Sequence, residues 1–209
     1  MKNILSNTAK RLLGHVEKKY DPFSYWNSRR DPNSAEGLEA ERVRFDTDYI
    51  RKQVSSGMSV LELGPGVGRT FHAYEKGTLI ETIDISRLYE KKLTEAAKAV
   101  DLKLKQHFLS DDWLKFPFSD QQFDVAVCFQ VFIHQPPEVF HRSFTEFSRV
   151  CKKGVISVGL HANTKQSNPA EGAHVFRHDY LHEASNNHKV INNLILRNNV
   201  LYFTIENID

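Results

Sequence analysis

The chain has 209 residues, of which 40% are hydrophobic and 26% are charged, and its formal net charge is +2. This length suffices for one domain with a full core, and so small a net charge gives no electrostatic argument for a nucleic-acid partner. Two cysteines, Cys128 and Cys151, exclude a disulfide framework and indicate buried thiols. No apolar run has the roughly 18 residues that a membrane span needs, and no signal-peptide core is apparent. We therefore expect a cytoplasmic protein without a membrane span.

The segment 1–56 predicts a helical extension, or lid, ahead of a main domain at 57–209. In residues 1–20, apolar positions at helical spacing alternate with lysines and arginines, which favours a helix that covers the domain or a partner subunit over one that lies on a membrane. A loop-rich segment follows. Apolar residues at helical spacing then indicate a second helix between about 39 and 54.

From residue 57 onward, strand-like and helix-like segments alternate, which indicates a parallel sheet with helices on both faces. We expect strands at 60–63, 79–83, 102–108, 123–129 and 155–160, and helices near 70–75, 89–100 and 137–150. The tail differs, because 190–196 and 200–205 are two β-rich runs joined by Arg197-Asn198-Asn199, which predicts a terminal hairpin. The fold class is therefore α/β.

The most informative segment joins the first strand to a glycine-rich turn, Glu62-Leu63-Gly64-Pro65-Gly66-Val67-Gly68-Arg69. Glycines there let the backbone turn tightly and approach a ligand, and a following helix would direct unpaired N–H groups to the same place. A P-loop would need Gly-Lys-Ser/Thr, which does not follow. A dinucleotide fingerprint would need glycine where Arg69 stands, which argues against an NAD-type oxidoreductase.

This turn resembles the first motif of the class I, Rossmann-like methyltransferases that depend on S-adenosylmethionine (SAM), a strand ending in Asp/Glu-x-Gly-x-Gly-x-Gly. The resemblance extends over about residues 40–160. It implies a three-layer sandwich around a mostly parallel seven-stranded sheet, completed by the antiparallel C-terminal hairpin. It also implies that SAM is the cofactor and that its site includes Glu62, Gly64, Pro65, Gly66 and Gly68.

Two acidic residues follow the next two strands. Asp84, with Ile85 after it, offers a carboxylate that can accept two hydrogen bonds from a ribose diol, and the resemblance assigns it to the ribose of SAM. An N-cap for the next helix is the alternative. The resemblance assigns Asp112 to the adenine amino group and puts Trp113 beside the purine ring. For Asp112 the alternatives are a one-residue shift to Asp111 or a solvated loop.

The end of the fourth strand supplies the candidate catalytic residue. Phe129 and Gln130 lie at its carboxyl end, where open α/β sheets place reacting groups, and they join the expected cofactor site. His134 follows and is the best candidate for a general base, because imidazole titrates near neutral pH. A histidine that packs near the cofactor without moving a proton is the alternative. His161, just past the fifth strand, is the candidate substrate residue.

Tyr25, Trp26 and Arg29 form a cluster similar to the N-terminal lid of some small methyltransferases. In such a lid an aromatic covers the cofactor and an arginine meets the methionine carboxylate. An aromatic face is favourable near a sulfonium, and a guanidinium binds a carboxylate as a planar fork. The alternative is a surface loop that packs through its aromatic side chains.

Three histidines, His174, His178 and His182, recur at spacing four, which on a helix would align three imidazoles and suggest a metal. No acidic or cysteine ligand accompanies them at a family position, so we favour a polar loop or short helix near the substrate entrance and expect no metal.

The sequence thus predicts a SAM-dependent methyltransferase whose acceptor is a small molecule, with an oxygen or nitrogen nucleophile, such as a sugar or another metabolite. The alternative is a non-catalytic SAM-binding regulator or partner subunit, which would keep the cofactor residues and lack an acceptor pocket. A nicotinamide-dependent oxidoreductase is less favoured. The oligomeric state stays open.

Overall fold

The computed structural model describes residues 20–28, 40–109, 115–159 and 175–207. The strands are β1 (Val60–Leu63), β2 (Leu79–Asp84), β3 (Lys103–Phe108), β4 (Phe123–Phe129), β5 (Cys151–Gly159), β6 (Lys189–Arg197) and β7 (Val200–Asn207). The α-helices are α2 (Pro22–Ser28), α3 (Ala40–Arg51), α4 (Glu90–Ala99), α5 (Pro137–Val150) and α6 (Tyr180–Asn186). Two 3-10 helices are η1 (Phe71–Ala73) and η2 (Phe132–His134).

The strands form one sheet in the order β3-β2-β1-β4-β5-β7-β6. Strands β1 to β5 are parallel, whereas β7 runs antiparallel to both β5 and β6. The central strands β1 and β4 are apolar over nearly their whole length because both of their faces are covered. The predicted α/β fold, with a seven-stranded sheet and a C-terminal antiparallel hairpin, is confirmed.

Two hydrophobic clusters cover the two faces of the sheet. On one face, α5 contributes Phe140, Phe144 and Phe147, which recur at helical spacing and pack with α6 and β7. On the other face, α3, η1 and α4 pack against the sheet, and α3 contributes the buried Tyr49 and Ile50. Helix α3 is therefore part of the core layer, and the division of the chain at residue 56 stays a prediction.

Two elements differ from those expected in type or by four residues at one end. A helix was expected near 70–75, and the structure has only the single 3-10 turn η1, because the Phe71 amide donates to the carbonyl of Gly68, whose φ is +79°. Strand β5 begins at Cys151 instead of 155. Gly154 permits this early start, since a Cβ there would lie 2.6 Å from Ile205 and 2.7 Å from Phe147.

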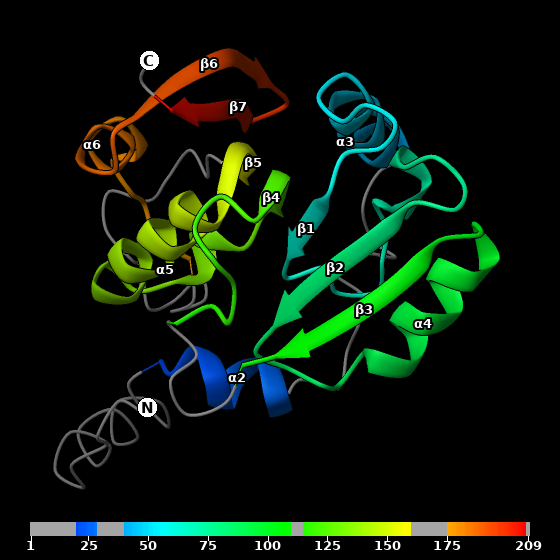
Figure 1. The fold of residues 1–209 in the computed structure, drawn as a ribbon. Helices are drawn as coiled ribbons and strands as arrows, with labels where there is room; N and C mark the ends of the chain where they lie inside the picture. Colours follow the sequence, from blue (N-terminus) through cyan, green and yellow to red (C-terminus); the bar gives the residue numbers. More distant parts are fainter. Residues whose placement is uncertain (1–19, 29–39, 110–114, 160–174, 208–209) are drawn as a thin grey trace, which may run out of the picture.

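Helix α2 lies apart from both core layers, at the carboxyl edge of the sheet. Figure 1 shows it, in blue, just beyond the arrowheads of β2 and β3. Its first turn is closed by Asp21, whose carboxylate accepts the Ser24 amide at 3.0 Å. Within the described ranges, no helix combines the length and apolar character needed to cross a membrane.

Candidate active site

The strand order reverses between β1 and β4, and in open α/β sheets this switch point is where ligands bind. The glycine turn leaves β1 there. Gly64 has φ +63°, donates its amide to the Ile83 carbonyl at 2.9 Å, and has no room for a Cβ, which would lie 2.4 Å from Val131. Gly66 differs, because its φ is +57° and, apart from its two chain neighbours, no atom of the described residues lies within 4 Å of the Cβ position. The turn is thus closed against the sheet and open at Gly66.

Glu62 lies on β1, one residue from the turn, and is 3% exposed. Its two carboxylate oxygens accept the hydroxyls of Thr70 at 2.5 Å and Tyr74 at 2.9 Å. Burial raises the pKa of Glu62, and the two hydroxyl donors oppose that effect. The structure therefore brings Glu62 to the base of the glycine turn, where it joins β1 to the residues directly before and after η1.

Asp84 ends β2 directly beside the turn, since Leu63 is paired with Ile83 in parallel register. Its carboxylate accepts the Ser86 amide at 2.9 Å, and burial raises the pKa of Asp84 to about 6. Ile85, next in the chain, is partly buried and packs against the α5 side of the core. Gly66 and Asp84 thus lie at the same edge, one offering open backbone and the other a carboxylate.

Tyr25 and Trp26, which the sequence predicts to form a lid, lie on α2, and hydrogen bonds join α2 to the segment after β2. The Trp26 carbonyl accepts the Ser86 hydroxyl at 3.1 Å, and the Asn27 side-chain amide donates to the Ile85 carbonyl at 2.9 Å. The rings of Tyr25 and Trp26 meet edge to face at 5.1 Å. The structure therefore brings α2 to the residues next to Asp84.

At the end of β4, Phe129 is buried against Tyr202, and Gln130 has φ +64°. A left-handed backbone is unusual for glutamine and is typical of functional sites where neighbouring groups hold it. Here Ser157 on β5 holds it, accepting the Gln130 amide at 2.8 Å and its side-chain amide at 3.1 Å. The chain after Gln130 is thereby turned into η2.

His134 ends η2, and its ring contacts α2. Its ring meets the Trp26 ring at 5.1 Å in an edge-to-face arrangement, and its carbonyl accepts the Tyr20 hydroxyl at 2.8 Å. The sequence-predicted residues Trp26 and His134, far apart in the chain, therefore meet at the carboxyl edge of the sheet.

Six residues singled out from the sequence lie outside the described residues: Arg29, Asp111, Asp112, Trp113, His161 and His174. Of the other two histidines, His178 donates a ring N–H to the Phe132 carbonyl at 3.0 Å and stacks on Phe140 at 3.8 Å. Burial lowers the pKa of His178 to about 4. His182 contacts Asn186 within α6. The described ranges contain no group of three or more His, Cys, Asp or Glu suited to a metal ion.

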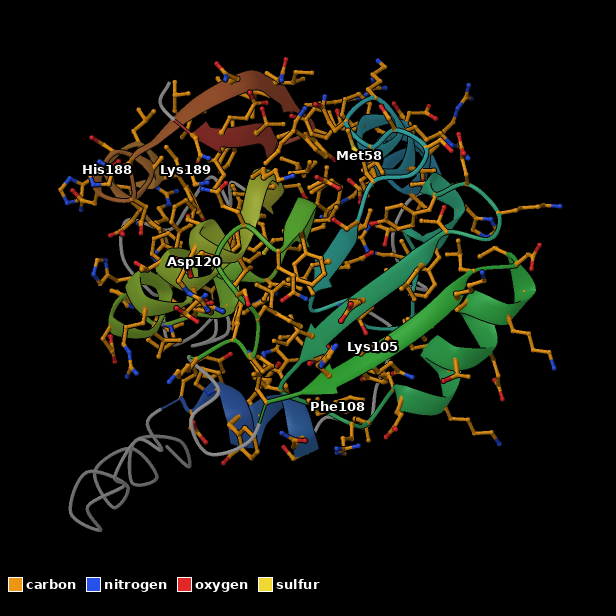
Figure 2. The ribbon with its side chains drawn as sticks, in the orientation of Figure 1. Met58, Lys105, Phe108, Asp120, His188 and Lys189 are labelled. Carbon is orange, nitrogen blue, oxygen red and sulfur yellow. The ribbon has the colours of Figure 1, made fainter. Side chains whose placement is uncertain are left out.

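Two networks that support the site were not foreseen from the sequence. Arg69, at the end of the glycine turn, pairs with the buried Asp46 of α3. Arg149 of α5 holds the loop before β4, including Asp120, which Figure 2 shows beside α5. The isolated arginine and aspartate gave no sequence signal of pairing, because their partners lie in distant segments.

A seven-stranded sheet with an antiparallel β7, a glycine turn after β1 and an acidic residue after β2 define the class I SAM-dependent methyltransferase fold. Residues 60–154 match the family described as a methyltransferase domain. Residues 60–154 are therefore similar to a methyltransferase domain, and the fold is that of the class I SAM-dependent methyltransferases, as the sequence predicted; SAM is the cofactor of that class.

Two curated methyltransferases resemble part of the chain at low sequence identity. Methyltransferase GfsG of Streptomyces halstedii is 27% identical over 135 residues, which is 63% of this chain and 47% of that protein. Sterol 24-C-methyltransferase ERG6B of Gibberella zeae is 29% identical over 105 residues, 49% of this chain and 27% of that protein. The chain thus spans less than half the length of these curated relatives.

Among solved structures, magnesium protoporphyrin IX methyltransferase (ChlM) from Synechocystis PCC 6803, crystallised with S-adenosylhomocysteine (SAH), has the same fold. The TM-score is 0.68 over 88% of this chain and 97% of that one, at 15% sequence identity. At this identity the likeness concerns the fold.

Proposed function

We propose that the protein transfers a methyl group from SAM to a small-molecule acceptor that binds between the glycine turn and α2. One observation carries the proposal: the open backbone at Gly66 and the carboxylate of Asp84 lie on the same sheet edge, with α2 fastened beside them. An open peptide surface and a carboxylate are what a nucleoside with a free ribose diol requires.

Residues of this chain that would hold SAM follow from that arrangement. Asp84 would accept the ribose hydroxyls, Gly64 to Gly68 would face the methionine portion, and Tyr25 and Trp26 would cover the sulfonium. Glu62 would act on the turn through Thr70 and Tyr74, whose hydroxyls it accepts. When bound, SAM supplies a methyl carbon activated by the sulfonium: the acceptor's electron pair forms the new bond, and the carbon–sulfur pair stays with sulfur.

The protein's own contribution would be to orient the acceptor and exclude water, which can lower a barrier by about 7–11 kcal/mol. A hydroxyl acceptor must also lose a proton. His134 is the candidate to take it, because its imidazole lies at the carboxyl edge against Trp26. The alternative role of His134 is to pack under α2 without moving a proton.

Calorimetric titration tests the cofactor assignment. We expect the full chain to bind SAM and SAH and not to bind NAD, and we expect Asp84→Ala to weaken SAH binding by about 1–3 kcal/mol, since hydrogen bonds to a charged acceptor are lost. NAD binding without SAH binding would refute the proposal. If the chain binds SAH but forms no SAH when it is incubated with SAM and candidate acceptors, the non-catalytic alternative would be favoured.

A further inference from the structure

Five rings from three separate segments meet at the carboxyl edge of the sheet: Tyr20, Tyr25, Trp26, His134 and Phe176. We refer to these five residues as the ring cluster. Centroid distances are 5.4 Å for Tyr20–Tyr25, 5.1 Å for Tyr25–Trp26, 5.1 Å for Trp26–His134 and 5.8 Å for Tyr20–Phe176. The contacts form an unbroken chain from the beginning of the described residues to the segment that precedes α6.

Hydrogen bonds fix the three segments relative to one another. The Tyr20 hydroxyl donates to the His134 carbonyl at 2.8 Å, and the Phe176 amide donates to the Ile133 carbonyl at 2.7 Å. On the other side, Asn27 donates to the Ile85 carbonyl, next to Asp84. The ring cluster is therefore held in place immediately beside the candidate cofactor site, which is where a methyl acceptor must bind.

Burial distinguishes the ring cluster from the core. Phe132, Phe144 and Phe147 are completely buried, whereas every member of the ring cluster is only partly buried. Rings that only fill a core lose their accessible surface. These rings retain accessible surface while lying at van der Waals range of one another, which is how aromatic side chains present faces and edges to a ligand.

Charged residues are sparse in the described segments that carry the ring cluster. In the described segments that carry it, 20–28, 132–135 and 175–178, the acidic and basic residues apart from histidine are Asp21 and Arg177. Asp21 is engaged at the start of α2, where its carboxylate accepts the Ser24 amide. A site for a sugar phosphate or another strongly polar acceptor would need several charged or hydrogen-bonding side chains directed at it.

We propose that the ring cluster binds the methyl acceptor and that this acceptor is an apolar, ring-bearing small molecule. The inference rests on the proposed function for its place beside SAM, and it deepens that function by naming the acceptor class. Within the small-molecule acceptors expected from the sequence, it selects apolar ring compounds over sugars.

The test uses 2-naphthol as an apolar ring probe and glucose as a polar one, each titrated calorimetrically into the full chain with and without SAH. We expect 2-naphthol to bind and glucose not to bind. Phe176→Ala should weaken 2-naphthol binding about fivefold, the loss expected for one aromatic contact, and should leave SAH affinity within about twofold. Leu181→Ala is the control, because Leu181 is 69% exposed on α6 and is not a member of the ring cluster.

The outcomes separate the two proposals. The proposed acceptor class would be overturned if glucose bound at least as tightly as 2-naphthol, or if Phe176→Ala and the wild type bound 2-naphthol equally well. If SAH still bound in that case, the methyltransferase proposal would stand. Absence of SAH binding would overturn the methyltransferase proposal, while the titration without SAH still tests the ring cluster. Where Phe176→Ala does not fold, Phe176→Leu retains the volume without the ring and is expected to show the same loss.

Discussion

The guanidinium of Arg69 pairs with the carboxylate of Asp46 and so joins the end of the glycine turn to helix α3. Asp46 is completely buried, and its second oxygen accepts the Tyr202 hydroxyl at 2.6 Å. Arg69 stands where a dinucleotide-binding turn would have its third glycine. The side chain of Arg69 is directed into the protein. Arg69 therefore argues against a dinucleotide cofactor and also fixes the turn that is predicted to bind SAM.

Asp46→Asn is expected to lower the free energy of unfolding by about 3–5 kcal/mol, because it leaves the Arg69 charge nearly buried without its counter-ion. Urea unfolding at neutral pH measures the change. Glu41→Gln is the matched control: it removes an acidic partner of an arginine, Arg197, at a pair whose side chains are 59% and 44% exposed, and should cost at most about 1 kcal/mol. Equal effects of the two substitutions would contradict the anchoring role.

Gly66→Ala compared with Gly57→Ala tests whether the open side of the glycine turn faces the cofactor. Both glycines have positive φ, and beyond their chain neighbours no atom in the described part of the chain lies within 4 Å of a Cβ, so both substitutions should cost about 1 kcal/mol of stability through backbone strain alone. Only Gly66→Ala should also weaken SAH binding, by tenfold or more, because its methyl group would occupy ligand space. SAH titration checks this, and an unchanged affinity in Gly66→Ala would remove Gly66 from the site.

Local patterns in the sequence were enough to predict the framework. Strands β1 and β4 and helix α5 have the predicted bounds, because continuous apolar runs and a proline in the first helical turn are local signals. The anchoring of the site is not local. In the sequence, Asp46 cannot be told apart from the other acidic residues of an amphipathic helix. Only the folded chain brings Asp46 into contact with Arg69 and Tyr202.

The residues around α2 and η2 show the same difference between local sequence signals and contacts that form only in the folded chain. Tyr25 and Trp26 were singled out as a local cluster, and His134 by its place after the fourth strand. Their meeting with Tyr20 and Phe176 depends on the path of two loops, which no periodicity encodes. The positive φ of Gln130, which turns the chain into η2, likewise gave no signal in the sequence.

The affinity for SAH should depend on pH through Asp84. Burial raises the pKa of this carboxyl from 3.8 to about 6, and ribose hydroxyls bind the ionised form. Protonation therefore competes with SAH, and affinity should fall about tenfold between pH 7.5 and pH 5. Calorimetry at the two pH values measures this. Asp84→Asn should bind weakly and lose this dependence, and a wild-type affinity that stays constant would show that Asp84 does not bind the ligand as a carboxylate.

The raised pKa of Asp84 has the opposite effect on the stability of the ligand-free protein: stability should fall as the pH rises, whereas SAH affinity should increase. A carboxyl whose pKa is raised on folding stabilises the fold below pH 3.8, and this contribution is lost as the pH rises through about 6. At pH 7 ionised Asp84 should thus cost about 3 kcal/mol. Asp84→Asn should accordingly raise the unfolding free energy of the ligand-free protein at pH 7 and have little effect near pH 4. A loss of stability at pH 7 would contradict the raised pKa.

Arg149 is expected to control SAH affinity from outside the site. Its guanidinium donates to the carbonyls of Phe116 at 3.2 Å and Phe118 at 2.8 Å, and it pairs with Asp120 and Glu146 at 2.8 and 2.7 Å. These bonds fix the segment that directly follows residues 110–114, where the adenine-binding aspartate is predicted. Only a planar fork with several donors can make them together.

Arg149→Lys keeps the charge and removes the fork, so it should weaken SAH binding about five- to tenfold and lower the unfolding free energy by about 1–3 kcal/mol. Arg44→Lys is the matched control, because Arg44 is 85% exposed on α3 and its contact with Asp48 is at 3.9 Å; it should change neither quantity measurably. Calorimetry and urea unfolding on the same samples separate the two effects. Reduced stability with unchanged SAH affinity would show that Arg149 supports the fold alone, whereas a loss of both would show that Arg149 also supports the loop that is predicted to bind adenine.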